Sequence, residues 1–319
     1  MRYKKVGKTD VDMSVLTIGT WAMGGLGYGS VERGDCIDAV RAMVENGVNH
    51  IDTAWVYGLG ASDKVVGEAI KGLRDKVLIT TKGGFRNNPE NPLEPNHPDC
   101  SPEWITYQLE TSLKNLGTDY VDFFLVHVPD ANTPFEETAD CINKWIKEGK
   151  VRYAGVSNYD VESTKAMGQY LDIVANQVGY SMINRAGEEE MKWMRDNGIG
   201  IETHSSLANG ILTGAIREVP HYPEDDIRNI YPMYAHLREP MFSKCMELLK
   251  TLDKISAERG KPVAQIALNW STQKDFVTSA LCGVRNVGEA MENIACTEWT
   301  LSDEEMAMID KAIAETVEA

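Results

Sequence analysis

Four side chains of the kinds that transfer protons stand at or near the ends of apolar runs. Asp52 ends the run NHID, Lys82 follows VLITT, and His127 ends VDFFLVH. Tyr57 comes five residues after Asp52, beside glycine. A lysine that ends an apolar run is costly to bury without a carboxylate, and Asp52 is the natural partner. Each residue alone has an ordinary structural explanation, so only their combination indicates a site.

This combination suits the placing of a proton on a carbonyl oxygen. A tyrosine hydroxyl, with an ordinary pKa of about 10, is a weak acid near neutral pH. A neighbouring ammonium stabilises the tyrosinate, so we expect Lys82 to lower the pKa of Tyr57. His127 could then donate a hydrogen bond to the substrate oxygen as charge develops on it. The hydride for such a reduction must come from another molecule.

A parallel barrel would bring these groups together, because its strands end at one face. Eight short runs alternate with helix-like stretches: SVLTIG, NHID, VLITT, VDFFLVH, YAGVS, DIVANQ, IGIET and VTSALC. Ser101 before Pro102, and Ser302 with Glu305, indicate helix starts. The sequence therefore predicts an α/β fold, a parallel eight-stranded (β/α)8 TIM barrel, with residues 1–319 as a single domain. We also expect a short N-terminal hairpin and a long loop after the seventh strand.

The alternative architecture is an open, doubly wound sheet. That fold usually carries G-x-G-x-x-G after its first strand, where a dinucleotide binds. The corresponding stretch here, GTWAMGGLGYGS (residues 19–30), is rich in glycine but never matches that spacing. We interpret it as a flexible loop at the mouth of the barrel.

Composition excludes several classes of function. A formal net charge of -16, without a Lys/Arg-rich run, argues against nucleic acid or an anionic membrane as partner. The start MRYKKVGKTDVDMS lacks the apolar core of a signal peptide. No stretch approaches the roughly 20 apolar residues of a membrane span. We therefore predict a cytoplasmic protein. The six cysteines lack C-x-x-C spacing and should be reduced, and no Cys/His cluster predicts a metal.

The ordered motifs resemble those of the aldo-keto reductases over nearly the whole chain. The family pattern D-T-A-x-x-Y-G stands as DTAWVYG (52–58), and TTK, SLKNLGTDYVDFFLVHVPD, AGVSN and NQVGY follow in the same order. The resemblance implies an oxidoreductase, a reductase or alcohol dehydrogenase that binds NAD(P)H without a Rossmann fold. It implies Tyr57 as acid and base, Lys82 and Asp52 as its tuning pair, and His127 as the ligand of the substrate oxygen.

The same resemblance implies residues for the nicotinamide end of the cofactor. The family's carboxamide-binding positions are occupied here by Ser157, Asn158 and Gln177. The family segment YSPLxxGxLTG reads HSSLANGILTG (204–214), so that His204 replaces the usual stacking aromatic and Ser206 replaces proline. An imidazole can stack, although with less area than tyrosine. Other cofactor contacts implied in this segment are Ser205, Leu207 and Gly210.

The segment CGVRNVGEAMENIA resembles the part of the family that grips the adenosine end, with matches at Gly283, Arg285, Asn286 and Asn293. Glu289 stands where an arginine often contacts the 2′-phosphate of NADPH. A carboxylate repels phosphate and accepts hydrogen bonds from a ribose hydroxyl. We therefore expect NAD(H) or NADP(H), with NADH slightly favoured, unless Arg285 reaches the phosphate.

The substrate side departs from the family pattern. Trp55 lies inside the Asp-Tyr motif, Val128 follows the histidine where tryptophan is common, and Trp21 lies in the first loop. Together with the tyrosines of the 216–240 loop, these residues could line the mouth of the barrel and contact a carbonyl or alcohol substrate, such as an aldehyde, ketone or sugar. The alternative is that they pack the loop onto the barrel. An accessory or regulatory subunit is the alternative function. The sequence leaves homo-oligomers open.

Overall fold

Each of the eight apolar runs forms one strand of a closed parallel barrel, which confirms the predicted fold class. The computed structural model describes residues 1–26, 31–88, 90–91, 94–224 and 226–319. Neighbouring strands pair in the circular order β3, β4, β5, β8, β9, β10, β11 and β12. Their bounds are β3 Leu16–Gly19, β4 His50–Asp52, β5 Leu78–Gly83, β8 Val121–Val126, β9 Val151–Ser157, β10 Ile173–Gly179, β11 Gly200–His204 and β12 Ser279–Gly283.

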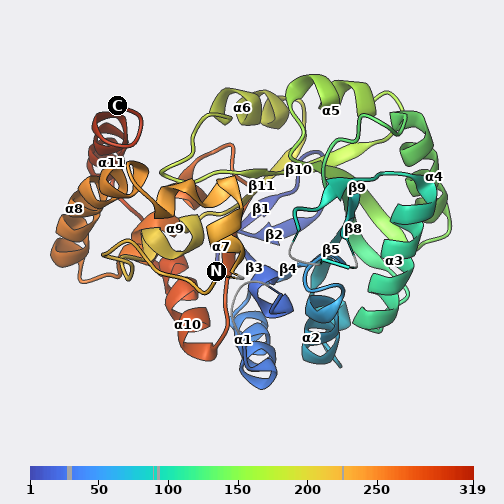
Figure 1. The fold of residues 1–319 in the computed structure, drawn as a ribbon, viewed down its shortest axis with the longest axis horizontal. Helices are drawn as coiled ribbons and strands as arrows, with labels where there is room; N and C mark the ends of the chain where they lie inside the picture. The colour runs from blue at the N-terminus through green and yellow to red at the C-terminus, as the bar shows by residue number, and fades with distance from the viewer. Residues whose placement is uncertain (27–30, 89, 92–93, 225) are drawn as a thin grey trace.

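Helices surround this barrel on its outer side (Figure 1). The helix bounds are α1 Arg33–Glu45, α2 Ala61–Ala69, α3 Pro102–Leu116, α4 Phe135–Lys147, α5 Val161–Met167, α6 Glu188–Asp196, α7 Ile227–Ile230, α8 Met241–Arg259, α9 Val263–Gln273, α10 Val287–Ala295 and α11 Asp303–Glu315. The short 3-10 helices are η1 Trp21–Gly24, η2 Arg74–Lys76, η3 Ala208–Thr213, η4 Pro232–Leu237 and η5 Cys296–Glu298. Among the described residues, no helix is long and apolar enough to cross a membrane.

The barrel strands separate two hydrophobic cores, because successive side chains point to opposite faces. All six residues of β8 are buried. Phe124 belongs to the large core between barrel and helices, whereas Phe123 and Leu125 belong to a small core with Val6 and Met13. A strand buried on both faces must be apolar throughout, which explains the continuous hydrophobic runs.

The predicted N-terminal hairpin consists of β1 (Tyr3–Lys5) and β2 (Asp12–Ser14), which pair antiparallel. Lys4 Nζ donates hydrogen bonds to the carbonyl oxygens of Thr272, Lys274 and Val277, at 2.9, 2.9 and 2.6 Å. These carbonyls precede β12, so the hairpin is fastened to the amino-terminal ends of the strands. With Val6 and Met13 in the inner core, the hairpin closes the floor of the barrel.

The predicted helix starts are found, with one difference in detail. Ser302 and Glu305 form the expected capping box at α11. Ser101 occupies the N-cap position of α3 and Pro102 follows it, but the Ser101 side chain caps nothing. Its hydroxyl instead donates a charge-assisted hydrogen bond to the Asp99 carboxylate at 2.6 Å.

Two loops at the mouth have more structure than the sequence indicates. In the glycine-rich stretch 19–30, residues 27–30 lie outside the described residues, but η1 is ordered and its Gly24 packs on Gly58. Gly58 has φ +63, and a Cβ there would lie 2.2 Å from the Gly24 carbonyl oxygen, so only glycine fits.

The 216–240 loop contains α7 and η4, with Tyr234 and Leu237 buried. Packing therefore accounts for part of this loop. Two further short strands, β6 (Phe85–Arg86) and β7 (His97–Pro98), pair antiparallel in the connection that follows β5, at the mouth end of the barrel.

Candidate active site

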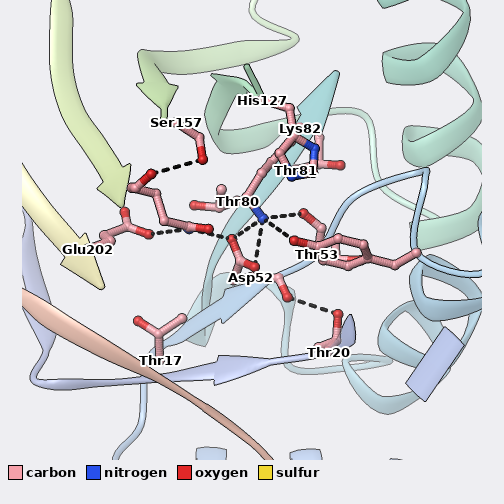
Figure 2. A network of polar contacts seen from close by, with 12 residues as sticks. Thr17, Thr20, Asp52, Thr53, Thr80, Thr81, Lys82, His127, Ser157 and Glu202 are labelled. Atoms are coloured by element: carbon pink, nitrogen blue, oxygen red, sulfur yellow. Dashed lines mark hydrogen bonds and ion pairs between the residues drawn. The ribbon is translucent and has the colours of Figure 1, made fainter. Parts of the chain in front are cut away.

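Three adjacent strands bring the predicted residues to one end of the barrel. Asp52 ends β4, Lys82 is the last residue but one of β5, and His127 follows β8 directly. The order β4, β5, β8 in the barrel makes these strand ends neighbours. Figure 2 shows the side chains of Asp52 and Lys82 meeting inside the barrel, with His127 close by.

The Lys82 ammonium is the centre of this group. Its Nζ lies 2.6 Å from Oδ1 and 2.7 Å from Oδ2 of Asp52, and the two side chains are 0% and 2% exposed. The same nitrogen donates to the Thr53 carbonyl at 3.2 Å and to the Tyr57 hydroxyl oxygen at 3.0 Å. Burial alone would favour the neutral amine, but the Asp52 carboxylate and Tyr57 raise the pKa of Lys82. Lys82 is therefore a charged donor to Tyr57.

The net pKa shift of Tyr57 is opposite to the one expected from the sequence. Burial raises the pKa of the Tyr57 hydroxyl, and the Lys82 ammonium offsets only part of this effect. The expectation was wrong because it counted the neighbouring cation and left out desolvation. The consequence is a tyrosine that keeps its proton at neutral pH. Since its oxygen accepts from Lys82, its O–H remains able to donate to another group.

His127 is placed as a neutral hydrogen-bond partner beside this hydroxyl. Its ring centroid lies 5.9 Å from that of Tyr57 and 4.7 Å from that of Phe85, which meets it edge to face. Burial, with the nearby Lys82 and His204, holds the pKa of His127 well below its usual range. No described residue makes a hydrogen bond to its ring nitrogens, so a ring N–H is available. Phe85 was not predicted, since a single aromatic after a strand carries no signal.

Ser157, Asn158 and Gln177 lie together at the ends of β9 and β10. The Ser157 hydroxyl donates to the backbone carbonyl of Gln177 at 2.9 Å, and Asn158 Nδ2 donates to the Ser157 hydroxyl at 3.1 Å. Asn158 is exposed and adopts a left-handed φ of 58. The Gln177 amide points into the barrel, where its Nε2 donates to Asp52 at 2.8 Å and to Glu202 at 3.0 Å.

Glu202 is a functional candidate that the sequence reasoning missed. It lies on β11, is 0% exposed, and is drawn with Asp52 in Figure 2. Burial, reinforced by the negative charge of Asp52, raises the pKa of Glu202 to about 7, although Gln177 and Lys82 oppose the shift. A carboxylate inside the run IGIET was the available signal, because a barrel strand has no solvent face to receive it.

The predicted cofactor segment 204–214 follows β11 with an unusual backbone. Ser205, Ala208 and Asn209 have positive φ values of 60, 46 and 53, and Gly210 has 99. Such conformations in residues other than glycine are strained and concentrate at binding sites. His204 is fixed through Nε2 to Asn158 Oδ1 at 3.1 Å and through Nδ1 to the Ser205 hydroxyl at 3.1 Å. Burial, with Lys82, lowers the pKa of His204 to about 4, so its ring is neutral. Leu207 is half-buried here.

The predicted adenosine-end residues gather around the start of α10. Arg285 and Glu289 form an ion pair at 2.9 Å, and the Arg285 backbone N–H donates to the same carboxylate at 2.9 Å. Asn286 caps α10 by accepting from the Glu289 N–H. Gly283 is exposed, and Asn293 Nδ2 lies 3.5 Å from its carbonyl oxygen. The Arg285 guanidinium therefore partly neutralises the Glu289 carboxylate, which the sequence predicts as a free negative charge.

The three predicted substrate residues lie in different surroundings. Trp21 stacks beside Tyr57, with ring centroids 5.8 Å apart and planes 9° apart. Trp55 packs against Trp104 and Tyr107 of α3, at 5.4 and 5.5 Å, so its ring contacts are with the helix layer. Val128 is half-buried, and its carbonyl accepts from the Cys100 thiol at 3.3 Å.

A small hollow connects the mouth to the long loop. Its lining includes Trp21, Val56, Asn87, Ile227 and Tyr231. Ile227 of α7 and Tyr231, which lies between α7 and η4, therefore line the same hollow as Trp21. The 216–240 loop thus both packs on the barrel and reaches the mouth.

Comparison with known proteins agrees with this geometry. The model of the Aldo/keto reductase family matches residues 15–314. The chain is 33% identical over 323 residues to Aldo-keto reductase YhdN of Bacillus subtilis (strain 168), covering 99% of this chain and 95% of that one. It is 32% identical over 339 residues to the NADH-specific methylglyoxal reductase of Escherichia coli (strain K12), covering 100% of each. The glycerol dehydrogenase AKR11B4 from Gluconobacter oxydans shares the fold with a TM-score of 0.89 and 28% identity, over 99% of this chain and 96% of that one. The chain therefore belongs to the aldo/keto reductase family, whose members are NAD(P)-dependent oxidoreductases.

Proposed function

We propose that this protein interconverts a small carbonyl compound and its alcohol with NAD(H) or NADP(H), and that Tyr57 exchanges the proton. The observation that carries this proposal is the 3.0 Å contact from Lys82 Nζ to the Tyr57 hydroxyl oxygen, inside a buried group that also holds Asp52. A reduced nicotinamide, when bound, supplies the hydride. The proton must then come from the protein.

The residues divide this work as follows. His127, neutral and with an available ring N–H, orients the carbonyl oxygen. As the C=O bond becomes C–O, Tyr57 donates its proton to that oxygen, and a charged Lys82 stabilises the tyrosinate that remains. In the reverse direction the tyrosinate removes the alcohol proton. The raised pKa of Tyr57 supports the acid role, because the acid must hold its proton before the reaction.

The donor and acceptor set beside Tyr57 fits a nicotinamide carboxamide. Asn158 and Ser157 offer polar groups at the end of β9, and the amide of Gln177 has both N–H donors engaged within the barrel, which leaves its carbonyl oxygen as an acceptor. His204 would face the ring, with Ser205, Leu207 and Gly210 along the strained segment. Gly283, Arg285, Glu289 and Asn293 would hold the adenosine end.

A slight preference for NADH is part of the proposal. Glu289 would accept from a ribose hydroxyl and repel a 2′-phosphate, but its pairing with Arg285 reduces the repulsion. The NADH-specific name of the Escherichia coli relative supports the same direction. The preference should therefore be modest.

The substrate class is a small aldehyde, ketone or sugar, or the matching alcohol. Trp21 lies against Tyr57 and, with Tyr231, borders the hollow at the mouth. Relatives named for methylglyoxal and glycerol support a small, polar substrate. Trp55 and Val128 would shape the wall indirectly. Residues 1–319 would act as one catalytic domain, which should unfold in a single cooperative transition.

The test is a screen of NADH and NADPH oxidation against aldehydes, ketones and sugars, with Tyr57→Phe as the matched control. This variant removes only the proton donor, so turnover should fall by about 10²- to 10⁴-fold while the Kd for the cofactor stays nearly unchanged. Near-normal turnover in Tyr57→Phe would refute the proton role. Cofactor binding without any turnover in the wild type would instead favour an accessory subunit.

A further inference from the structure

Glu202 is a buried carboxylate for which the proton-transfer scheme has no role. It is the third residue of β11, and its side chain lies wholly inside the barrel. Oε2 accepts a hydrogen bond from Gln177 Nε2 at 3.0 Å, whereas no described residue donates to Oε1. An acidic group with so few partners costs stability in the interior of a barrel. Such a residue calls for a reason beyond packing.

The contact with Gln177 determines which way that amide faces. A glutamine amide has two N–H donors on one side and a carbonyl acceptor on the other. Nε2 stands 2.8 Å from Oδ1 of Asp52 and 3.0 Å from Oε2 of Glu202, so each carboxylate takes one donor. Rotating the amide by 180° would place its oxygen against the Asp52 carboxylate. The two acids together therefore leave the side-chain oxygen Oε1 of Gln177 without a donor from the described protein.

The same contacts connect the cofactor position to the proton donor. Asp52 receives Gln177 on Oδ1 and the Lys82 ammonium on both oxygens, and Lys82 in turn holds Tyr57. Glu202 stands at the far end of this chain of hydrogen bonds, which Figure 2 shows running from Glu202 toward Asp52 and Lys82. A residue in that place acts on a ligand only through Gln177.

Resting on the cofactor role proposed above, we propose that Glu202 is a positioning residue for the nicotinamide. With Asp52, it locks the Gln177 amide so that the carbonyl oxygen is presented to an N–H donor, namely the carboxamide of the cofactor. Without Glu202, one Gln177 donor would have no partner and the amide would turn more freely. The loss should appear in cofactor affinity more than in the chemical step.

The experiment compares Glu202→Leu and Glu202→Gln by fluorescence titration with NADH and NADPH. Glu202→Leu removes the acceptor, and Kd should rise about tenfold, which corresponds to about 1.4 kcal/mol. Glu202→Gln keeps an acceptor oxygen at the same place, so its Kd should stay within about threefold of the wild type. With saturating cofactor, kcat of both variants should change much less than Kd.

Asp122→Leu is the matched control for loss of a buried carboxylate. Asp122 lies at the start of β8, is 1% exposed and is bound by Arg74 and Arg152, at the opposite end of the strand from the site. This variant should lower the melting temperature and leave Kd unchanged. A Glu202→Leu protein that also loses only stability would overturn the proposal. A wild type that binds neither cofactor would refute the proposed function itself, which is a separate outcome.

The pH dependence of Kd decides the matter if Glu202→Leu does not fold. An ionised Glu202 holds the Gln177 N–H more strongly, so wild-type affinity should increase from pH 6 to pH 8, around the pKa of about 7. The charged groups acting on Glu202 are Asp52 of β4, which reinforces the raised pKa, and Lys82 of β5, which opposes it. On the neighbouring strand β12, Ser279 stands at the paired position. Glu202→Gln should show a flat profile. Identical profiles in the two proteins would overturn the proposal.

Discussion

The Lys82–Asp52 pair should dominate the stability of the site, and Lys82→Met tests this directly. The ammonium lies 2.6 and 2.7 Å from the two carboxylate oxygens, with both side chains nearly inaccessible. Removing Lys82 would leave Asp52 with Gln177 as its remaining side-chain donor among the described residues. Breaking a buried pair from one side costs about 3–5 kcal/mol, so the unfolding equilibrium constant should rise by about 10²- to 10⁴-fold.

A double-mutant cycle separates the pair from the loss of either side chain. Asp52→Asn should also destabilise, because it leaves the Lys82 ammonium without its carboxylate. The combined variant removes both charges, so its loss of unfolding free energy should be smaller than the sum of the two single losses by at least about 2 kcal/mol. Urea unfolding of the four proteins measures these free energies. Additive losses would show that the two groups do not stabilise each other.

The sign of the pH dependence gives a second check on Lys82→Met. Burial already raises the pKa of Asp52 in the wild type against the opposing Lys82 ammonium, and without the ammonium this pKa should rise further. A raised folded pKa contributes stability at low pH that is lost as the pH rises through that pKa. The gap between wild type and Lys82→Met should therefore be small near pH 4 and grow towards pH 7. A gap that narrows with rising pH would contradict the reasoning.

Two further outcomes follow from the structure. Glu289→Arg should remove a repulsive charge and release Arg285, and the ratio of NADPH to NADH affinity should shift by about tenfold towards NADPH, less so with added salt. A wild type that already prefers NADPH in fluorescence titration would contradict the assigned role of Glu289. Burial raises the pKa of Asp63 to about 6 against the opposing hydrogen bonds of Thr53 and Ser112, so the wild type should lose about 2 kcal/mol of unfolding free energy as the pH rises from about 4 to 7. Asp63→Asn should flatten this dependence in urea unfolding, and an unchanged slope would assign it to other groups.

The fold could be predicted because a closed parallel barrel leaves a strong mark on sequence. Its strands are buried on both faces, so runs such as VDFFLVH are apolar throughout and their ends mark the mouth. Asp52, Lys82 and His127 could be found for the same reason, since each has an ordinary structural explanation alone but their combination at three such ends does not. Tyr57 and the cofactor residues depended on their resemblance to a family pattern.

Other properties of the site depend on distances that a sequence does not contain. The pKa of Tyr57 is set by the balance between desolvation and one ammonium, and the sequence shows only the ammonium. The direction of the Gln177 amide depends on two carboxylates from different strands, 125 and 25 residues away. The pairing of Arg285 with Glu289 was within reach, because Arg285 stands four residues before Glu289 and next to the N-cap of α10.

The closed floor of the barrel also determines how the protein can be attached to other materials. The hairpin β1–β2, which Lys4 fastens beneath the strands, lies at the end of the barrel opposite to Tyr57. Lys5 and Lys8 extend from this end and are about half exposed. A resin, electrode or fusion partner joined through the N-terminal residues would therefore hold the protein with its mouth directed towards the solution, where cofactor and substrate arrive.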